Sequence, residues 1–104
     1  MNKNWQAIKQ QLTEKEWLTN GYYRLRKQGE YYEFAFLQPG PCGDFMYHPQ
    51  ITVQEIANEP VPIKCFDNGG SSVQSFVRDE SNQQQLNEIF EQLMQTYLEE
   101  KIGK

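Results

Sequence analysis

The strongest constraint on the fold lies near the C-terminus, where eight apolar residues recur at steps of three and four. They are Leu86, Ile89, Phe90, Leu93, Met94, Tyr97, Leu98 and Ile102, and polar residues fill the positions between them. This spacing predicts an amphipathic helix of about five turns with one broad apolar stripe. Asp79 or Ser81 can cap the start of this helix. A stripe of this length needs an apolar partner of similar length elsewhere in the chain.

A second, shorter helix is predicted at the N-terminus, where Trp5, Ile8 and Leu12 share one helical face. The segment 13–16 follows, with Thr at its first position and Glu at its last. This pattern resembles a capping box, so we expect a break and then a short second helical turn before Gly21.

The middle of the chain begins with a predicted β-hairpin over 22–37, with Gln28 and Gly29 as its two-residue loop. In this register Arg24 faces Glu33 across the two strands. One face of the hairpin is then apolar, and it consists of Tyr23, Leu25, Tyr32, Phe34 and Phe36. The other face is polar but rich in aromatic residues.

The residues after this hairpin are harder to assign. Two Pro and two Gly within 38–44 predict a loop, and 45–48 can form a short strand that ends at Pro49. For 51–58 a second capping-box pattern favours one or two helical turns, and a strand through Ile51 and Val53 is the alternative.

A second hairpin is predicted from strands over 61–66 and 72–78 around a loop at 68–70. The expected register pairs Cys65 with Val73. The whole chain (1–104) is therefore predicted to be a single α+β domain. Its antiparallel sheet would have four to five strands from two hairpins, with the N-terminal helix and the long C-terminal helix packed on one face.

Charge and composition limit the function. The net charge of −4 and the pI near 4.9 argue against binding nucleic acid through its phosphates. No apolar run is long enough to cross a membrane, and the first residues lack the apolar core of a secretion signal. We therefore expect a cytoplasmic protein, in which the two cysteines stay reduced.

Reactive side chains gather at Cys42, Asp44 and His48, with Cys65 and Asp67 later in the chain. Two thiolates, one imidazole and a carboxylate could hold zinc, and Cys42 with His48 could act as a nucleophile and its base. The spacings match no zinc module, and the chain has a single His. We therefore expect structural roles for these residues, with no metal and no cofactor.

A second candidate site lies on the polar face of the first hairpin, where Tyr22, Arg24, Arg26 and Tyr31 alternate with the apolar residues. Arginine and aromatic side chains on a sheet can stack nucleic-acid bases, but the basic surroundings of such a platform are missing. The same residue types are enriched at the centres of protein interfaces.

We therefore predict a small non-enzymatic protein-interaction module, such as an adaptor, regulator, immunity protein or chaperone. It would use the Tyr22, Arg24, Arg26 and Tyr31 face or the loop from Pro39 to His48, and self-association is one form this could take. The alternative is a small-molecule-binding domain or minor enzyme. Its pocket would lie between the sheet and the helices, with Cys42, Asp44 and His48 at the mouth.

Overall fold

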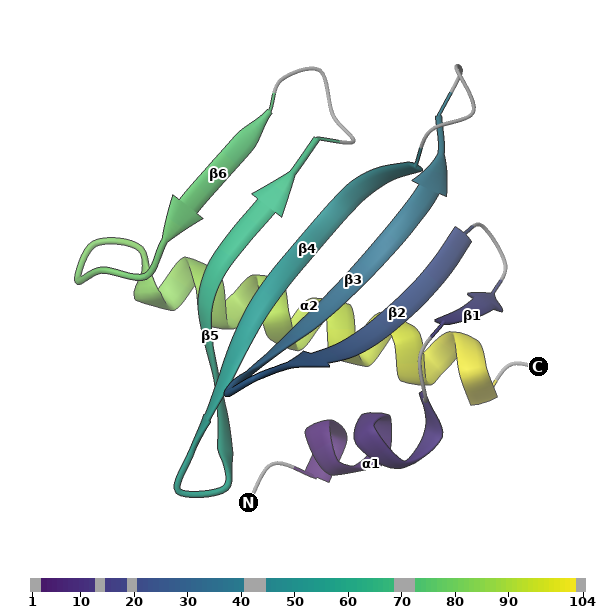
Figure 1. Cartoon of the computed structure of the whole chain (residues 1–104), viewed down its shortest axis with the longest axis horizontal. Coiled ribbons are helices and arrows are strands. Elements are labelled where there is room, and N and C mark those ends of the chain that lie inside the picture. The colour runs from purple at the N-terminus through teal and green to yellow at the C-terminus, as the bar shows by residue number, and fades with distance from the viewer. Residues whose placement is uncertain (1–2, 13–14, 19–20, 41–44, 69–72, 103–104) are drawn as a thin grey trace.

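In the described part of the chain, six strands form one antiparallel sheet in sequence order, with a helix before the first strand and another after the last (Figure 1). The computed structural model describes residues 3–12, 15–18, 21–40, 45–68 and 73–102. Its elements are α1 (Lys3–Gln11), β1 (Lys15–Leu18), β2 (Gly21–Gln28), β3 (Tyr31–Pro39), β4 (Phe45–Ile56), β5 (Glu59–Asp67), β6 (Gln74–Val77) and α2 (Gln83–Ile102). The predicted α+β class is confirmed, but the prediction of four to five strands was too low.

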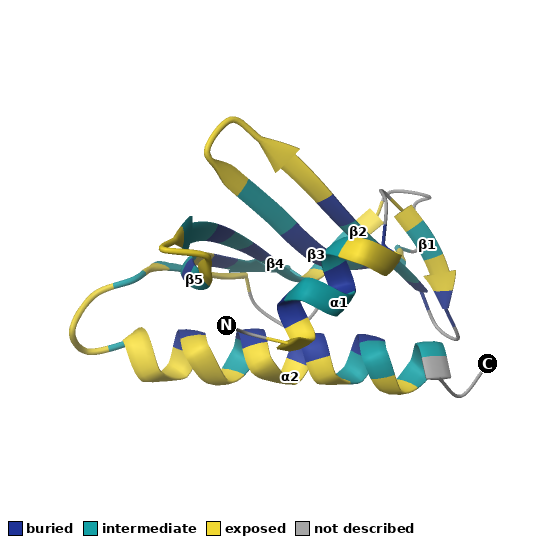
Figure 2. Cartoon of the chain, turned by 90° about the horizontal axis from the view of Figure 1, so that it is seen from below, coloured by how far each residue is buried: buried dark blue, intermediate teal, exposed yellow. Residues whose placement is uncertain are grey.

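Both helices cover the same face of the sheet, and the core lies between them and the strands (Figure 2). Trp5 of α1 is fully buried and packs its ring edge-on against Phe34 of β3 and Phe90 of α2. Tyr97 of α2 contacts the ring of Tyr23 on β2 at a centroid distance of 5.2 Å. The apolar face predicted for the first hairpin is therefore the face that the helices cover.

The apolar stripe of α2 is confirmed, since Leu86, Phe90, Leu93, Met94 and Tyr97 are all buried. The chain leading into α2 is capped by Asp79, whose Oδ1 accepts hydrogen bonds from the backbone N–H groups of Ser81 and Asn82. Its carbonyl accepts a further bond from the N–H of Gln83. The helix thus begins where the sequence predicted a side-chain cap.

The helical turn predicted before Gly21 is wrong, because Lys15–Leu18 is strand β1. It pairs with the start of β2, and this pairing sets Trp17 directly opposite Tyr22. Leu18 is buried, and Glu16 binds Lys101 and Tyr97 of α2. These contacts with distant residues outweigh the local capping preference.

The helix favoured for 51–58 is also wrong, and so is the end of the preceding strand at Pro49. A single strand, β4, runs through both regions, with Ile51 and Val53 buried on the core face. The β3–β4 register shifts opposite Pro49, and a proline without an N–H is tolerated at such an irregularity. Ala57 and Asn58 have φ of 53° and 68° and make the tight turn into β5.

Both predicted hairpins exist, but their registers differ from those predicted. In the first, the loop lies at Gly29-Glu30, and Arg26 rather than Arg24 faces Glu33. This shift of two residues leaves every side chain on its predicted face. In the second, Cys65 pairs with Phe76 instead of Val73.

The change in the second hairpin is a shift of three residues, which turns β6 over. Phe76 packs against the core, whereas Val73 and Val77 are 68% and 61% exposed. The predicted apolar face of this strand is therefore wrong.

In the described part of the chain, no helix is long and apolar enough to cross a membrane.

Candidate functional site

The sheet face opposite the helices, which we call the open face, has no helix over it in the described residues. Cross-strand pairing places Trp17, Tyr22 and Leu37 on this face, one on each of the first three strands. The same pairing continues from Leu37 to Tyr47 on β4, and from Gln50 on β4 to Phe66 on β5.

Five aromatic side chains form a band across the open face, and we call it the aromatic row. Its members are Trp17, Tyr22, Phe45, Tyr47 and Phe66. The ring of Tyr22 contacts Trp17 at a centroid distance of 4.8 Å and Phe45 at 5.5 Å, and Tyr47 contacts Phe66 at 6.1 Å. Trp17 is 49% exposed and Phe45 is 40% exposed, so much of the row meets solvent.

Two cations lie directly on the aromatic row. Lys15 Nζ is 4.3 Å from the centroid of the Tyr22 ring and 4.6 Å from that of Phe45. The guanidinium carbon of Arg24 is 5.5 Å from the Tyr47 ring centroid. The Nε of Arg24 is buried and has no hydrogen-bond partner among the described residues. The rings attract both cations and hold them at the surface of the sheet.

The open face is basic, although the chain is acidic. The strands place Lys15, Arg24, Arg26 and Lys64 on this face. Among the described residues, two carboxylates stand against these four cations, those of Glu33 and, at the tip of the β4–β5 hairpin, Glu59. The carboxylate of Glu33 also accepts a hydrogen bond from Gln50. An anionic partner would therefore meet a favourable potential here.

The structure brings together only part of the first predicted site. Tyr22 and Arg24 lie in the aromatic row or on it, whereas Arg26 is exposed beside Glu33. Tyr31 begins β3 at the far end of the face and is 39% exposed. In the β2–β3 register, Tyr31 pairs with Gln28.

The second predicted site has His48 as its one described member, since Cys42 and Asp44 lie outside the described residues. His48 Nδ1 is 2.8 Å from Oδ1 of Asp67, and both side chains are partly exposed. Burial raises the pKa of the Cys65 thiol to about 11, and the nearby charge of Asp67 adds to this shift. Within the described ranges, no group of three or more His, Cys, Asp or Glu residues could hold a metal ion.

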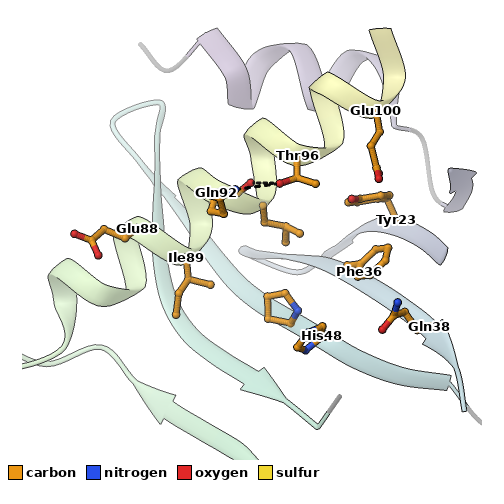
Figure 3. A pocket seen from close by; sticks show the side chains of 11 residues that line it. Tyr23, Phe36, Gln38, His48, Glu88, Ile89, Gln92, Thr96 and Glu100 are labelled. Carbon is orange, nitrogen blue, oxygen red and sulfur yellow. Dashed lines mark hydrogen bonds between the residues drawn. The ribbon is translucent and has the colours of Figure 1, made fainter. Parts of the chain in front are cut away.

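His48 opens onto a cavity of about 500 Å³ between α2 and the sheet, which we call the helix groove (Figure 3). Its apolar walls are Tyr23, Phe36, Pro49, Ile89 and Leu93. The groove lies on the helix-covered side of the sheet. His48 and the aromatic row are therefore on opposite faces of the sheet.

Comparison with models of known protein families found no match, and neither did comparison with curated proteins or with solved structures. Function must therefore be argued from the two faces themselves.

Sequence reasoning missed most of the aromatic row. Lys15 and Trp17 belong to the segment predicted to be helical, so their alignment with Tyr22 was hidden. The sequence predicts a short strand for Phe45 and Tyr47 but does not give the place of this strand in the sheet. The four residues of β1 read polar, polar, apolar, apolar, so they carry no period-two signal that could have predicted the strand.

Proposed function

We propose that this chain is a protein-interaction module whose open face binds an acidic segment of another protein. The observation that carries the proposal is the aromatic row, an exposed band of rings on a helix-free sheet face with Lys15 and Arg24 resting on it. Aromatic residues and arginine are the side chains that most often dominate binding energy at protein interfaces.

The charges favour a different protein over a second copy of this chain. A two-fold contact through the open face would bring four cations of one copy toward the same four of the other. Like charges brought together across an interface are unfavourable. An acidic segment would instead pair its carboxylates with Lys15 and Arg24, and the buried Arg24 Nε lacks a partner among the described residues.

Selection from a library of short random peptides tests the proposal. The wild-type chain serves as bait, and the affinity of each selected peptide is then measured for the wild type and for the double variant Lys15→Gln, Arg24→Gln. We expect the selected peptides to combine Asp or Glu with aliphatic or aromatic residues. Their affinity should fall by roughly tenfold or more in the double variant, since close interfacial charge pairs are worth a few kcal/mol.

Lys27→Gln is the matched control, because Lys27 lies on β2 beside these residues but points to the helix side, near Tyr32. This variant should bind the selected peptides as the wild type does. A selection that yields no acidic peptides, or peptides that bind the double variant equally well, would contradict the proposal. So would saturable, salt-sensitive binding of a single-stranded oligonucleotide to the open face.

A further inference from the structure

We propose that the helix groove is a binding site for an apolar amine, that is, a ligand with a protonated amino group on a hydrocarbon body. The site is independent of the open face, since it lies on the other side of the sheet. A volume of about 500 Å³ is within the usual range for pockets that bind small molecules.

The groove exists because α1 fills only one side of the space under the sheet. On that side, Trp5 packs against Phe90 of α2. On the other side, Ile89 and Thr96 of α2 face Phe36 and His48 of the sheet across the open space (Figure 3). The apolar walls of the groove contact each other only in part, so some of their surface remains in water. A hydrocarbon that fills the gap would remove this surface from water, which is favourable.

The preference for a cation comes from Glu100 at one end of the groove. Its side chain points toward Tyr23 in Figure 3, and its Oε2 atom is buried without a hydrogen-bond partner among the described residues. Leaving a buried acceptor unpaired is unfavourable, and more so for a charged group. A ligand in the groove that turns the Glu100 carboxylate toward itself and donates to this oxygen would recover that free energy.

Tyr23 lies beside the Glu100 carboxylate. Burial raises the pKa of the Tyr23 hydroxyl and the interaction with Glu100 adds to this shift, so the hydroxyl remains a donor. The aromatic rings of Tyr23 and Phe36 are 4.9 Å apart at the same end of the groove. Aromatic faces next to a carboxylate suit an ammonium group.

The remaining charges do not favour an anion. His48 Nδ1 is 2.8 Å from Asp67, so a carboxylate already occupies the place beside the imidazole that an anionic ligand would need. Glu88 stands at the opposite end of the groove and points away from it. Glu88 and Glu100 are separated by twelve residues of α2, or about 18 Å, so the site suits an elongated ligand.

Three probes with the same carbon skeleton test this inference by titration calorimetry: octylamine, octan-1-ol and octanoate. We expect octylamine to bind one molecule per chain, at least about tenfold more tightly than octanol, and octanoate to bind most weakly. Glu100→Gln should bring the amine and alcohol affinities together without weakening the alcohol. Glu99→Gln, the exposed neighbour on α2, should change neither affinity.

A second variant locates the site. Thr96→Phe places a ring in the groove and should weaken all three probes while leaving the far-ultraviolet circular dichroism unchanged. The inference is overturned if no probe saturates, if octanoate equals octylamine, or if Glu100→Gln preserves the amine preference. It is also overturned if sedimentation reveals a dimer that Thr96→Phe dissociates, because a second copy would then occupy the groove.

Discussion

The hydroxyl of Tyr97 donates a hydrogen bond of 2.9 Å to Oε1 of Glu16, which ties the last helix to the first strand. Lys101 binds the other oxygen of the same carboxylate. Tyr97 and Glu16 are 81 residues apart in the chain. The short edge strand β1 is thus held both by β2 and by α2.

This contact makes stability depend on pH. The hydrogen bond from Lys101, with a further one from Tyr97, lowers the pKa of Glu16 below its ordinary value of 4.5, although burial opposes the shift. A lowered pKa in the folded state stabilises the fold above the unfolded value, and this stabilisation is lost as the pH falls through the folded value. Glu16→Gln should therefore reduce the free energy of unfolding by about 1–2 kcal/mol at neutral pH.

The free energy of unfolding of the wild type and of Glu16→Gln can be measured by urea unfolding at neutral pH and at about pH 3. The difference between the two proteins should shrink at the lower pH. Glu99→Gln, which alters an exposed carboxylate on α2, should stay close to the wild type at both. An equal deficit of Glu16→Gln at both pH values would contradict the expectation.

The two tryptophans should respond differently to a quencher in solution. Trp5 is fully buried and its Nε1 donates a 2.8 Å hydrogen bond to Glu55, whereas Trp17 is 49% exposed on the open face. Acrylamide should quench the fluorescence of Trp5→Phe, which retains Trp17, several-fold more than that of Trp17→Phe. In high urea the two variants should be quenched equally, and a similar difference there would argue that the effect does not come from the fold.

The register of β6 can be tested by substitutions on its two faces. Phe76 packs against the core and Val77 is 61% exposed. Phe76→Ala should therefore cost about 2 kcal/mol or more, somewhat below the value for a fully buried ring. Val77→Thr should stay within about 0.5 kcal/mol of the wild type, as surface substitutions do. The register predicted from sequence requires the reverse order in thermal unfolding.

Cys65 should be unreactive in the folded protein. Burial raises the pKa of its thiol to about 11, so the reactive thiolate is scarce at neutral pH. In a Cys42→Ser background, where Cys65 is the remaining thiol, a disulfide reagent should react slowly until urea unfolds the chain. Rapid reaction in the absence of urea would place Cys65 nearer to solvent than the structure does.

Local patterns in the sequence predicted the elements whose contacts are close in the chain. The apolar stripe of α2 repeats with the period of a helix, and the alternation from Tyr23 to Phe36 repeats with the period of a strand. Each pattern could therefore be recognised without knowing the rest of the fold. In the first hairpin, the side chains lie on the faces predicted for them because the error in register was an even number of residues.

The failures occurred where distant contacts or unusual turns decide the structure. The Thr13–Glu16 pattern suggested a helix start, but Lys15–Leu18 pairs with β2 and Glu16 binds α2. The Ala57-Asn58 turn contains no glycine, so the β4–β5 hairpin gave no local signal. Likewise, no local pattern could place Glu100 beside Tyr23.

The charges of this chain are divided between its two sides. Among the described residues, the open face carries Lys15, Arg24, Arg26 and Lys64 against Glu33 and Glu59, whereas α2 carries four glutamates and one lysine. The molecule thus has an electric dipole across its thickness, which its isoelectric point conceals. A negatively charged surface nearby would exert a torque on the tumbling protein and turn the open face toward itself before any contact forms.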